Sequence, residues 1–128
     1  MKFFYANKIR SALFLAAVIF TPNAQAAAEL VMVEETGCMW CARWNAQIAP
    51  IYPKTEAGKA APLRRIDKNT PLPNDIKLAR PVLFTPTFII LLDGIEAGRL
   101  EGYAGEDFFW SLLEQLLVQN DILVDGLQ

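Results

Sequence analysis

The chain has 128 residues, of which 53% are hydrophobic, and its 12 basic and 14 acidic side chains leave a formal net charge of −2. No basic patch with interleaved aromatic residues is present, which argues against nucleic acid as a partner. The chain contains two cysteines and no histidine. Two cysteines cannot supply the four ligands of a structural zinc site, and haem attachment needs a histidine where Ala42 stands. We therefore expect no cofactor and no resident metal.

Residues 1–26 have the pattern of a secretory signal peptide. Three basic residues precede an apolar stretch at 12–20, and Ala24-Gln25-Ala26 offers a cleavage site of the small-x-small type. The apolar stretch is shorter than the roughly 20 residues that a membrane-spanning helix needs. We therefore predict cleavage rather than a retained membrane anchor, and export to the periplasm.

The predicted mature chain, residues 27–128, has the length of one domain with a single hydrophobic core. Loss of the signal peptide removes three basic residues, so that 9 basic side chains face 14 acidic ones. We expect a single acidic domain that acts as a monomer in the periplasm, without stable insertion into the membrane.

The first predicted strand, Leu30-Val31-Met32-Val33, leads into Cys38-Met39-Trp40-Cys41, and a helix-like run at 42–48 follows. Cysteines at i and i+3 of a first helical turn lie on one side of the helix, close enough to form a disulfide. The unpaired N–H groups at a helix N-terminus favour a thiolate at Cys38, and Cys41, one turn further on, is suited to resolve a mixed disulfide. A purely structural disulfide is the weaker interpretation, because so short a loop contributes little stability.

The rest of the chain alternates strands and helices and ends in a hairpin and a helix. A sheltered Trp44 and an exposed Trp40 are expected within the motif helix. The last predicted helix has an apolar stripe of Phe109, Leu112, Leu113, Leu116 and Leu117. The other predicted elements, in chain order, are a helical stretch at 54–61, an edge strand at 63–67, a short helix at 75–80 capped by Asn74 or Asp75, a strand that starts after Pro86 within the stretch 84–92, a strand at 95–101 joined through Asp93-Gly94, and the helix at 106–119.

This order predicts an α/β fold with a mixed central sheet of about four strands and helices on both faces. On Arg64 and Arg65 of the edge strand, a solvated strand face is favoured over a role in binding an acidic partner.

The chain resembles the thioredoxin superfamily over nearly all of residues 27–128. The matching motifs are Gly37-Cys38-Met39-Trp40-Cys41, Thr85-Pro86-Thr87-Phe88, Asp93-Gly94 and Gly102-Tyr103-x-Gly105. The resemblance implies a thioredoxin-like fold, in which Cys38 and Cys41 are catalytic and Pro86, in a cis peptide bond, faces them. It also implies that Thr85 offers backbone groups to a bound substrate strand, with Pro86, Met39 and Trp40 completing the substrate-binding surface.

Within the superfamily, the chain is similar to small exported thioredoxins that accompany bacterial sulfur-oxidation (Sox) systems. The similar segments are 37–44, 51–58 and 61–65. This likeness implies a thiol–disulfide oxidoreductase that reduces the disulfide of a periplasmic partner protein, such as a sulfur-carrier protein. An upstream membrane or periplasmic thiol reductant would then restore the dithiol.

Two departures from the thioredoxin pattern bear on the mechanism. Met32 stands where thioredoxins have a buried carboxylate. Glu34 or Glu35 is a candidate for the missing proton transfer to Cys41, although a solvated strand end is the favoured interpretation. No histidine stabilises the Cys38 thiolate, which indicates a milder oxidant than strong disulfide donors and leaves reductase and isomerase activity open.

A copper-carrying thioredoxin-fold protein is the alternative function. Cu(I) prefers soft sulfur ligands, and Met32 and Met39 accompany the two cysteines. Proteins of this kind usually add a histidine to the site, and this chain has none.

Overall fold

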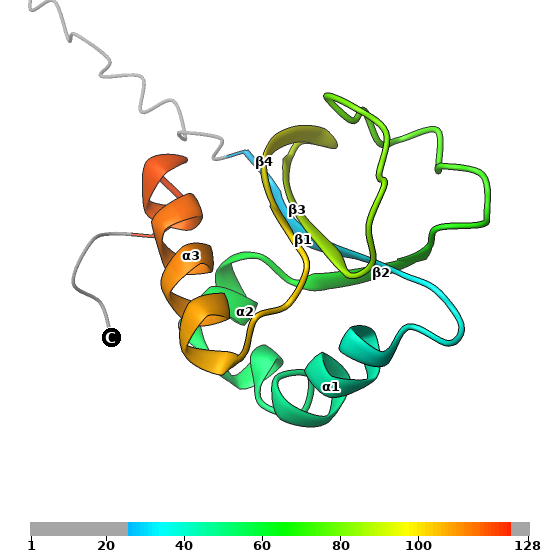
Figure 1. The fold of residues 1–128 in the computed structure, drawn as a ribbon. Coiled ribbons are helices and arrows are strands. Elements are labelled where there is room, and N and C mark those ends of the chain that lie inside the picture. The colour runs from blue at the N-terminus through cyan, green and yellow to red at the C-terminus, as the bar shows by residue number, and fades with distance from the viewer. Residues whose placement is uncertain (1–25, 124–128) are drawn as a thin grey trace, which may run out of the picture.

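The computed structural model describes residues 26–123, so the predicted signal peptide lies outside the described residues except for its last position. A four-stranded mixed sheet forms the centre, in the order β2-β1-β3-β4 (Figure 1). β1 pairs in parallel with β2 and antiparallel with β3, and β4 pairs antiparallel with β3. The elements are β1 (Ala28–Glu34), α1 (Met39–Gln47), the 3-10 helix η1 (Tyr52–Lys54), α2 (Glu56–Ala60), β2 (Leu63–Asp67), β3 (Thr87–Leu92), β4 (Ile95–Glu101) and α3 (Glu106–Gln119).

The main hydrophobic core lies between one face of the sheet and the helices α1 and α3. Side chains alternate between the two faces along a strand, and Leu30 and Met32 of β1 point to this side together with Phe88 and Ile90 of β3. Trp44 of α1 is fully buried there, with its ring centroid 5.2 Å from that of Phe88. The sequence-based prediction that Trp44 faces the interior is confirmed.

The opposite face of the sheet is covered by an irregular segment at 68–86. The predicted helix at 75–80, with its cap at Asn74 or Asp75, is wrong: these residues form a turn, a short bridge and bends. The backbone of Lys77 instead hydrogen-bonds to Gly94 and Glu96 of the β3–β4 hairpin. A single turn of helix between two prolines is marginal, and pairing with the hairpin satisfies the backbone better.

The apolar side chains of this segment cover the sheet face, as those of a helix would. Ile76 is buried, and Leu78 and Val82 pack beside it on Val31, Val33, Ile89 and Leu91 of the sheet. Helices therefore cover only one face of the sheet in the described part of the chain, while the mixed four-stranded α/β fold itself is as predicted. No helix within residues 26–123 combines the length and apolar character needed to cross a membrane.

A nearly buried ion pair anchors the covering segment to β4. The Glu96 and Arg99 side chains are each 4% exposed, and the Arg99 Nε donates to Glu96 Oε1 at 2.6 Å. Glu96 also accepts from the Ala79 N–H, and Arg99 donates to the Arg80 carbonyl. Burial alone would raise the pKa of Glu96, but these hydrogen bonds and the positive charges of Arg99 and Arg80 outweigh it and lower the pKa.

Glu96→Gln should destabilise the fold in a pH-dependent way. A carboxylate whose pKa is lowered by folding stabilises the native state above its ordinary value of 4.5, and this contribution is lost as the pH falls through the folded value. We expect Glu96→Gln to cost about 1.5–3 kcal/mol at pH 7, and the difference from the wild type to shrink below pH 4.5. Urea unfolding at pH 7 and at acidic pH measures both.

Glu56→Gln is the matched control, because Glu56 pairs with Lys59 on the surface with both side chains at least 60% exposed. It should cost less than about 1 kcal/mol at either pH. A loss of unfolding free energy by Glu96→Gln that is equally large at pH 7 and at acidic pH would contradict the prediction.

The helix α3 has the predicted bounds, and its apolar stripe is narrower than predicted. Phe109, Leu113 and Leu117 are buried. Leu116 is partly buried and packs close to Gly98 of β4, where an added Cβ would lie 2.8 Å from its Cδ2. Leu112 is 43% exposed, so its assignment to the buried stripe is wrong. The stripe follows positions i, i+4 and i+8, and Leu112 lies just outside it.

Leu113→Ala and Leu112→Ala should lower the free energy of unfolding by different amounts, because Leu113 is buried and Leu112 is exposed. Leu113 is 0% exposed, so its truncation leaves a cavity and should cost about 2–5 kcal/mol of the free energy of unfolding. Leu112→Ala, one residue earlier on the same helix, should cost less than about 1 kcal/mol. Equal losses in denaturant unfolding would contradict the orientation of α3.

Candidate active site

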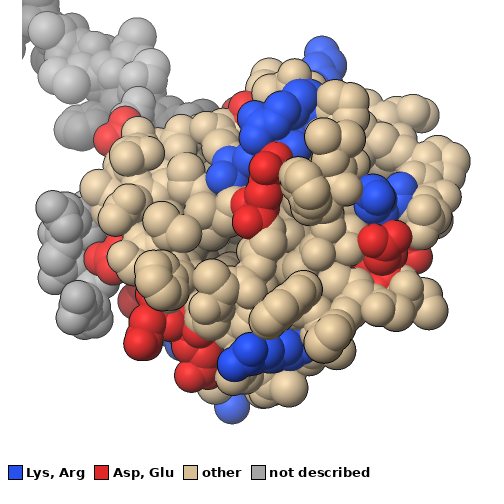
Figure 2. Space-filling view, in the orientation of Figure 1, with Lys and Arg blue, Asp and Glu red and all other residues tan. Residues whose placement is uncertain are grey.

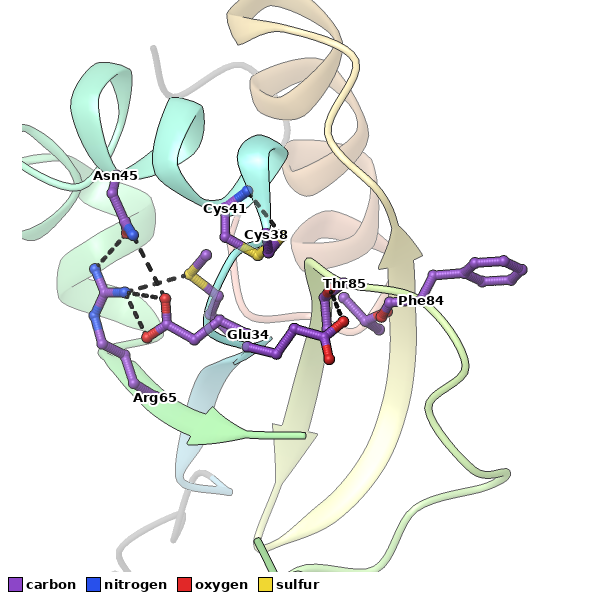
Figure 3. Close-up of a disulfide and its surroundings, with 10 residues drawn as sticks. Glu34, Cys38, Cys41, Asn45, Arg65, Phe84 and Thr85 are labelled. Atoms are coloured by element: carbon purple, nitrogen blue, oxygen red, sulfur yellow. Dashed lines mark hydrogen bonds and ion pairs between the residues drawn. A yellow bond between two sulfur atoms is a disulfide. The ribbon is translucent and has the colours of Figure 1, made fainter. Parts of the chain in front are cut away.

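Cys38 and Cys41 form a disulfide at the start of α1, immediately after β1 (Figure 3). Their Cα atoms are 5.2 Å apart. Cys38 is the N-cap of the helix, with extended backbone angles, and its Sγ accepts a hydrogen bond from the Cys41 N–H at 3.1 Å. Gly37, at φ 82°, makes the turn that leads from the strand into the helix.

The two sulfur atoms differ in accessibility. Cys41 is 3% exposed and belongs to the main core, whereas Cys38 is only partly buried. Cys38 is therefore the sulfur that a large partner can reach. A helix N-terminus stabilises negative charge, because its first N–H groups have no partner within the helix. The geometry suits a nucleophile at Cys38 and a sheltered resolving thiol at Cys41.

The loop before β3 lies beside the disulfide. The Thr85–Pro86 peptide bond is cis, Pro86 is buried, and the Pro86 carbonyl accepts from the Gly102 N–H at 2.7 Å. The Thr85 Oγ1 donates to Glu35 Oε1 at 2.7 Å, which ties this loop to the loop that precedes Cys38 (Figure 3). No local pattern could predict this contact, because the two residues are 50 positions apart.

The residues with predicted binding roles differ in exposure: Met39 and Trp40 are exposed, Thr85 is partly buried and Pro86 is buried. The side chains of Met39 and Trp40 are 72% and 48% exposed, and the exposure predicted for Trp40 is confirmed. Within residues 26–123, the backbone N–H and C=O of Thr85 make no backbone hydrogen bond. The structure therefore brings Met39, Trp40, Thr85 and Pro86 to the edge of one site.

Beneath the site, Met32 occupies the position where thioredoxins have a carboxylate. Met32 is fully buried, and its sulfur lies 3.6 Å from Nη1 of Arg65. Arg65 also donates to both carboxylate oxygens of Glu34, at 2.9 and 3.0 Å, and to Asn45 Oδ1 at 2.8 Å (Figure 3). Its guanidinium lies over the Trp44 ring, 5.7 Å from the centroid.

This network shows how Arg65 and the two candidate carboxylates are bound. Arg65 is exposed on β2, as expected for a solvated strand face, and it is paired there with Glu34 and Asn45. Glu34 is bound by Arg65 and Glu35 by Thr85, so both carboxylates have partners other than the cysteine pair. Within residues 26–123, no group of three or more His, Cys, Asp or Glu side chains is arranged to hold a metal ion.

A search of solved structures returned the periplasmic thioredoxin SoxS from Paracoccus pantotrophus in its reduced form. It is 54% identical to this chain with a TM-score of 0.71, and the match covers 72% of this chain and 97% of SoxS. The chain belongs to the thioredoxin superfamily. Malassezia sympodialis thioredoxin (Mala s 13) is far more distant, with 16% identity, a TM-score of 0.49, and coverage of 71% of this chain and 76% of that one. No family model and no curated protein matched the sequence.

The predicted likeness to Sox-associated thioredoxins and the predicted thioredoxin-like fold are thus confirmed. The thioredoxin relationship, together with the Cys-x-x-Cys disulfide, makes this protein a thiol–disulfide oxidoreductase. The disulfide in the structure is the oxidised form of such an enzyme, whereas the SoxS structure is of the reduced form.

The different burial of the two sulfurs predicts the order of alkylation. After reduction, Cys38 should react with iodoacetamide at least about 10-fold faster than Cys41, because it is the more exposed and lies at the helix N-terminus. Peptide mass spectrometry of samples quenched at successive times measures both rates. Equal rates, or a faster Cys41, would contradict the assignment.

Proposed function

We propose that the protein is a periplasmic thioredoxin that reduces the disulfide of a partner protein through Cys38 and Cys41, and that this partner is a protein of sulfur oxidation, the sulfur carrier in the first place. The observation that supports the proposal best is the exposed Cys38 of a Cys-x-x-Cys disulfide in a chain 54% identical to a periplasmic Sox thioredoxin. Export would follow from the signal peptide predicted for residues 1–26, with the domain at 27–128 as the mature protein.

The reaction has two exchange steps. In the reduced enzyme, the Cys38 thiolate attacks one sulfur of the partner's disulfide; a Cys38–partner bond forms and the other partner sulfur leaves as a thiolate that takes up a proton. The Cys41 thiolate then attacks Cys38 Sγ and releases the second partner sulfur. Two electrons pass to the partner, and the enzyme ends with the Cys38–Cys41 disulfide.

Substrate binding is proposed at the exposed edge of the site. The partner's chain would lie extended against Thr85, whose N–H and C=O are available for the hydrogen bonds of an added strand. Met39 and Trp40 would contact the partner on the helix side, and the buried Pro86 would keep Thr85 in place beside the disulfide.

A further turnover needs a reductant. The disulfide must accept two electrons from a dithiol, and we propose a membrane or periplasmic thiol donor for this step. In the described part of the chain, the neutral Met32 is buried at the position of the thioredoxin carboxylate, so no acid at that position exchanges a proton with Cys41. Solvent or the incoming thiol would supply and accept the protons.

Cys41→Ala should trap the substrate. Without the resolving thiol, the mixed disulfide at Cys38 persists, so the exported variant should retain defined periplasmic proteins that are released by dithiothreitol. Non-reducing electrophoresis followed by mass spectrometry identifies them, and a protein of sulfur oxidation is expected among them. The double variant Cys38→Ala/Cys41→Ala is the matched control and should retain none.

Two outcomes would contradict the proposal in different ways. Trapping of periplasmic proteins that include none of sulfur oxidation would overturn the proposed partner and leave the reductase. Trapping of nothing, together with stoichiometric Cu(I) binding by the reduced wild type, would favour the copper carrier, for which Met39 beside the cysteine pair is the available soft ligand.

A further inference from the structure

An arginine lies next to the exposed tryptophan of the motif. The Arg43 guanidinium carbon is 5.7 Å from the centroid of the Trp40 ring, one helical turn earlier on α1. Residues 26–123 contain five arginines, and the other four are all in ion pairs with glutamate or aspartate. Among these residues Arg43 forms no ion pair, and its position beside Trp40 offers its charge to a partner at the disulfide.

The surroundings of Arg43 connect it to the substrate side of the site. The Tyr103 hydroxyl donates to Gln47 Oε1 of α1 at 2.8 Å, and the preceding Gly102 donates to the Pro86 carbonyl. Arg43 lies one helical turn before Gln47 on α1. Burial and the charge of Glu106 raise the pKa of Tyr103, and the charge of Arg43 opposes them. Arg43 is thus on the helix that is bound to the turn supporting the Thr85–Pro86 loop.

On the loop that precedes Thr85, two apolar side chains are exposed. Leu83 and Phe84 are 69% and 59% exposed, and Phe84 stacks with no aromatic ring in the described part of the chain. The backbone beneath them is held, because the Phe84 carbonyl accepts from Thr87 Oγ1 at 2.7 Å and Thr85 is bound to Glu35. The Phe84 ring projects away from the disulfide and off the loop (Figure 3).

Several charged side chains of the described residues are already paired. On the face shown in Figure 2, basic and acidic side chains lie in small mixed groups between wide uncharged areas. Glu34 is paired with Arg65, and Glu101 with Arg80. Within residues 26–123, the features that remain for a partner beside the motif include the charge of Arg43 and the apolar side chains of Leu83 and Phe84.

We propose that Arg43 and the pair Leu83-Phe84 are specificity-determining residues, which select a partner segment with an acidic side chain on one side of its reactive cysteine and an apolar side chain on the other. The inference rests on the proposed function, because it describes the segment that the Thr85 edge would bind. An extended segment laid along Thr85 crosses from the start of α1 to the loop before β3, and so passes Arg43 at one end and Phe84 at the other.

Competition between short peptides tests this selection on the full protein. Each peptide carries one cysteine as a mixed disulfide with 2-mercaptoethanol. The cysteine is flanked by Glu, Gln or Lys on one side and by Leu or Ser on the other. Every combination is made twice, with the charged or amide residue before the cysteine and with it after the cysteine. Release of the peptide thiol by the reduced enzyme is followed by chromatography. The ratio of rates between peptides is the readout, because a general change in the reactivity of Cys38 cancels in it.

The wild type should reduce the Glu peptide about 5-fold faster than the Lys peptide in one of the two directions, in line with an exposed ion pair replaced by a repulsion. Arg43→Glu should reverse this order. Lys54→Glu makes the same change of net charge at an exposed lysine of η1 that is in no ion pair within residues 26–123, and should leave the order unchanged.

Phe84→Ala should lower the preference for Leu over Ser about 3-fold, whereas Ile95→Ala, at the opposite end of the hairpin, should not.

Equal rates for Glu, Gln and Lys peptides with both the wild type and Arg43→Glu would overturn the inference while leaving the reductase intact. A reversal that Lys54→Glu reproduces would overturn it too, because the effect would then come from net charge. Failure to release thiol from any peptide, by an enzyme shown to be reduced and folded, would overturn the proposed function and the docking surface with it.

Discussion

The active site depends on the double pairing of β1. This strand is bound in parallel to β2 on one side and antiparallel to β3 on the other, in a register that sets Val33 opposite Thr87. The Cys-x-x-Cys turn follows the end of β1, and Pro86 precedes the start of β3. The register therefore places the disulfide beside the Thr85–Pro86 loop, and a slip by one residue would turn the core side chains of β1 to the wrong face.

The hydrogen bonds around the disulfide fix the residues that position it and leave its exposed side accessible. Glu35 binds Thr85, Gly102 binds Pro86, and Arg65 joins Glu34 to Asn45 of α1. Each of these bonds ends on a group that positions the site, while Cys38, Trp40 and the backbone of Thr85 remain available. A thiol–disulfide oxidoreductase needs both properties. A partner sulfur must reach Cys38 in line with the sulfur–sulfur bond that breaks, and the enzyme must stay folded during the exchange.

Met32 and Arg65 replace the buried acid of thioredoxins with a different arrangement. A thioether can be buried without a hydrogen-bond partner, whereas an unpaired carboxylate at the same place would be costly. Arg65 then lies over Met32 and Trp44 and is satisfied by Glu34 and Asn45 at the rim. A neutral side chain thus occupies the buried position, and the Arg65–Glu34 ion pair lies nearer the surface.

Local patterns in the sequence were sufficient for most of the helices and strands and for the cysteine pair. The spacing of Cys38 and Cys41 after an apolar strand, the Asp93-Gly94 turn and the apolar period of α3 are all properties of neighbouring residues, so they can be read without knowing the fold. The thioredoxin motifs added Thr85 and Pro86 to the predicted site. The misassigned helix at 75–80 and Leu112 show the limit, because in both cases the hairpin or the helix packing determined the outcome.

Only the tertiary structure determined which charged side chains form ion pairs or hydrogen bonds and which do not. Arg64 and Arg65 are adjacent in sequence, yet Arg65 is bound to Glu34 beneath the site and Arg64 to Asp75 on the covering segment. Glu35 contacts Thr85 across 50 residues, while Arg43 lies over the Trp40 ring and forms no ion pair within residues 26–123. Such pairings depend on which strands lie side by side, and that is a property of the folded sheet, because residues far apart in the chain carry no local signal of their contact.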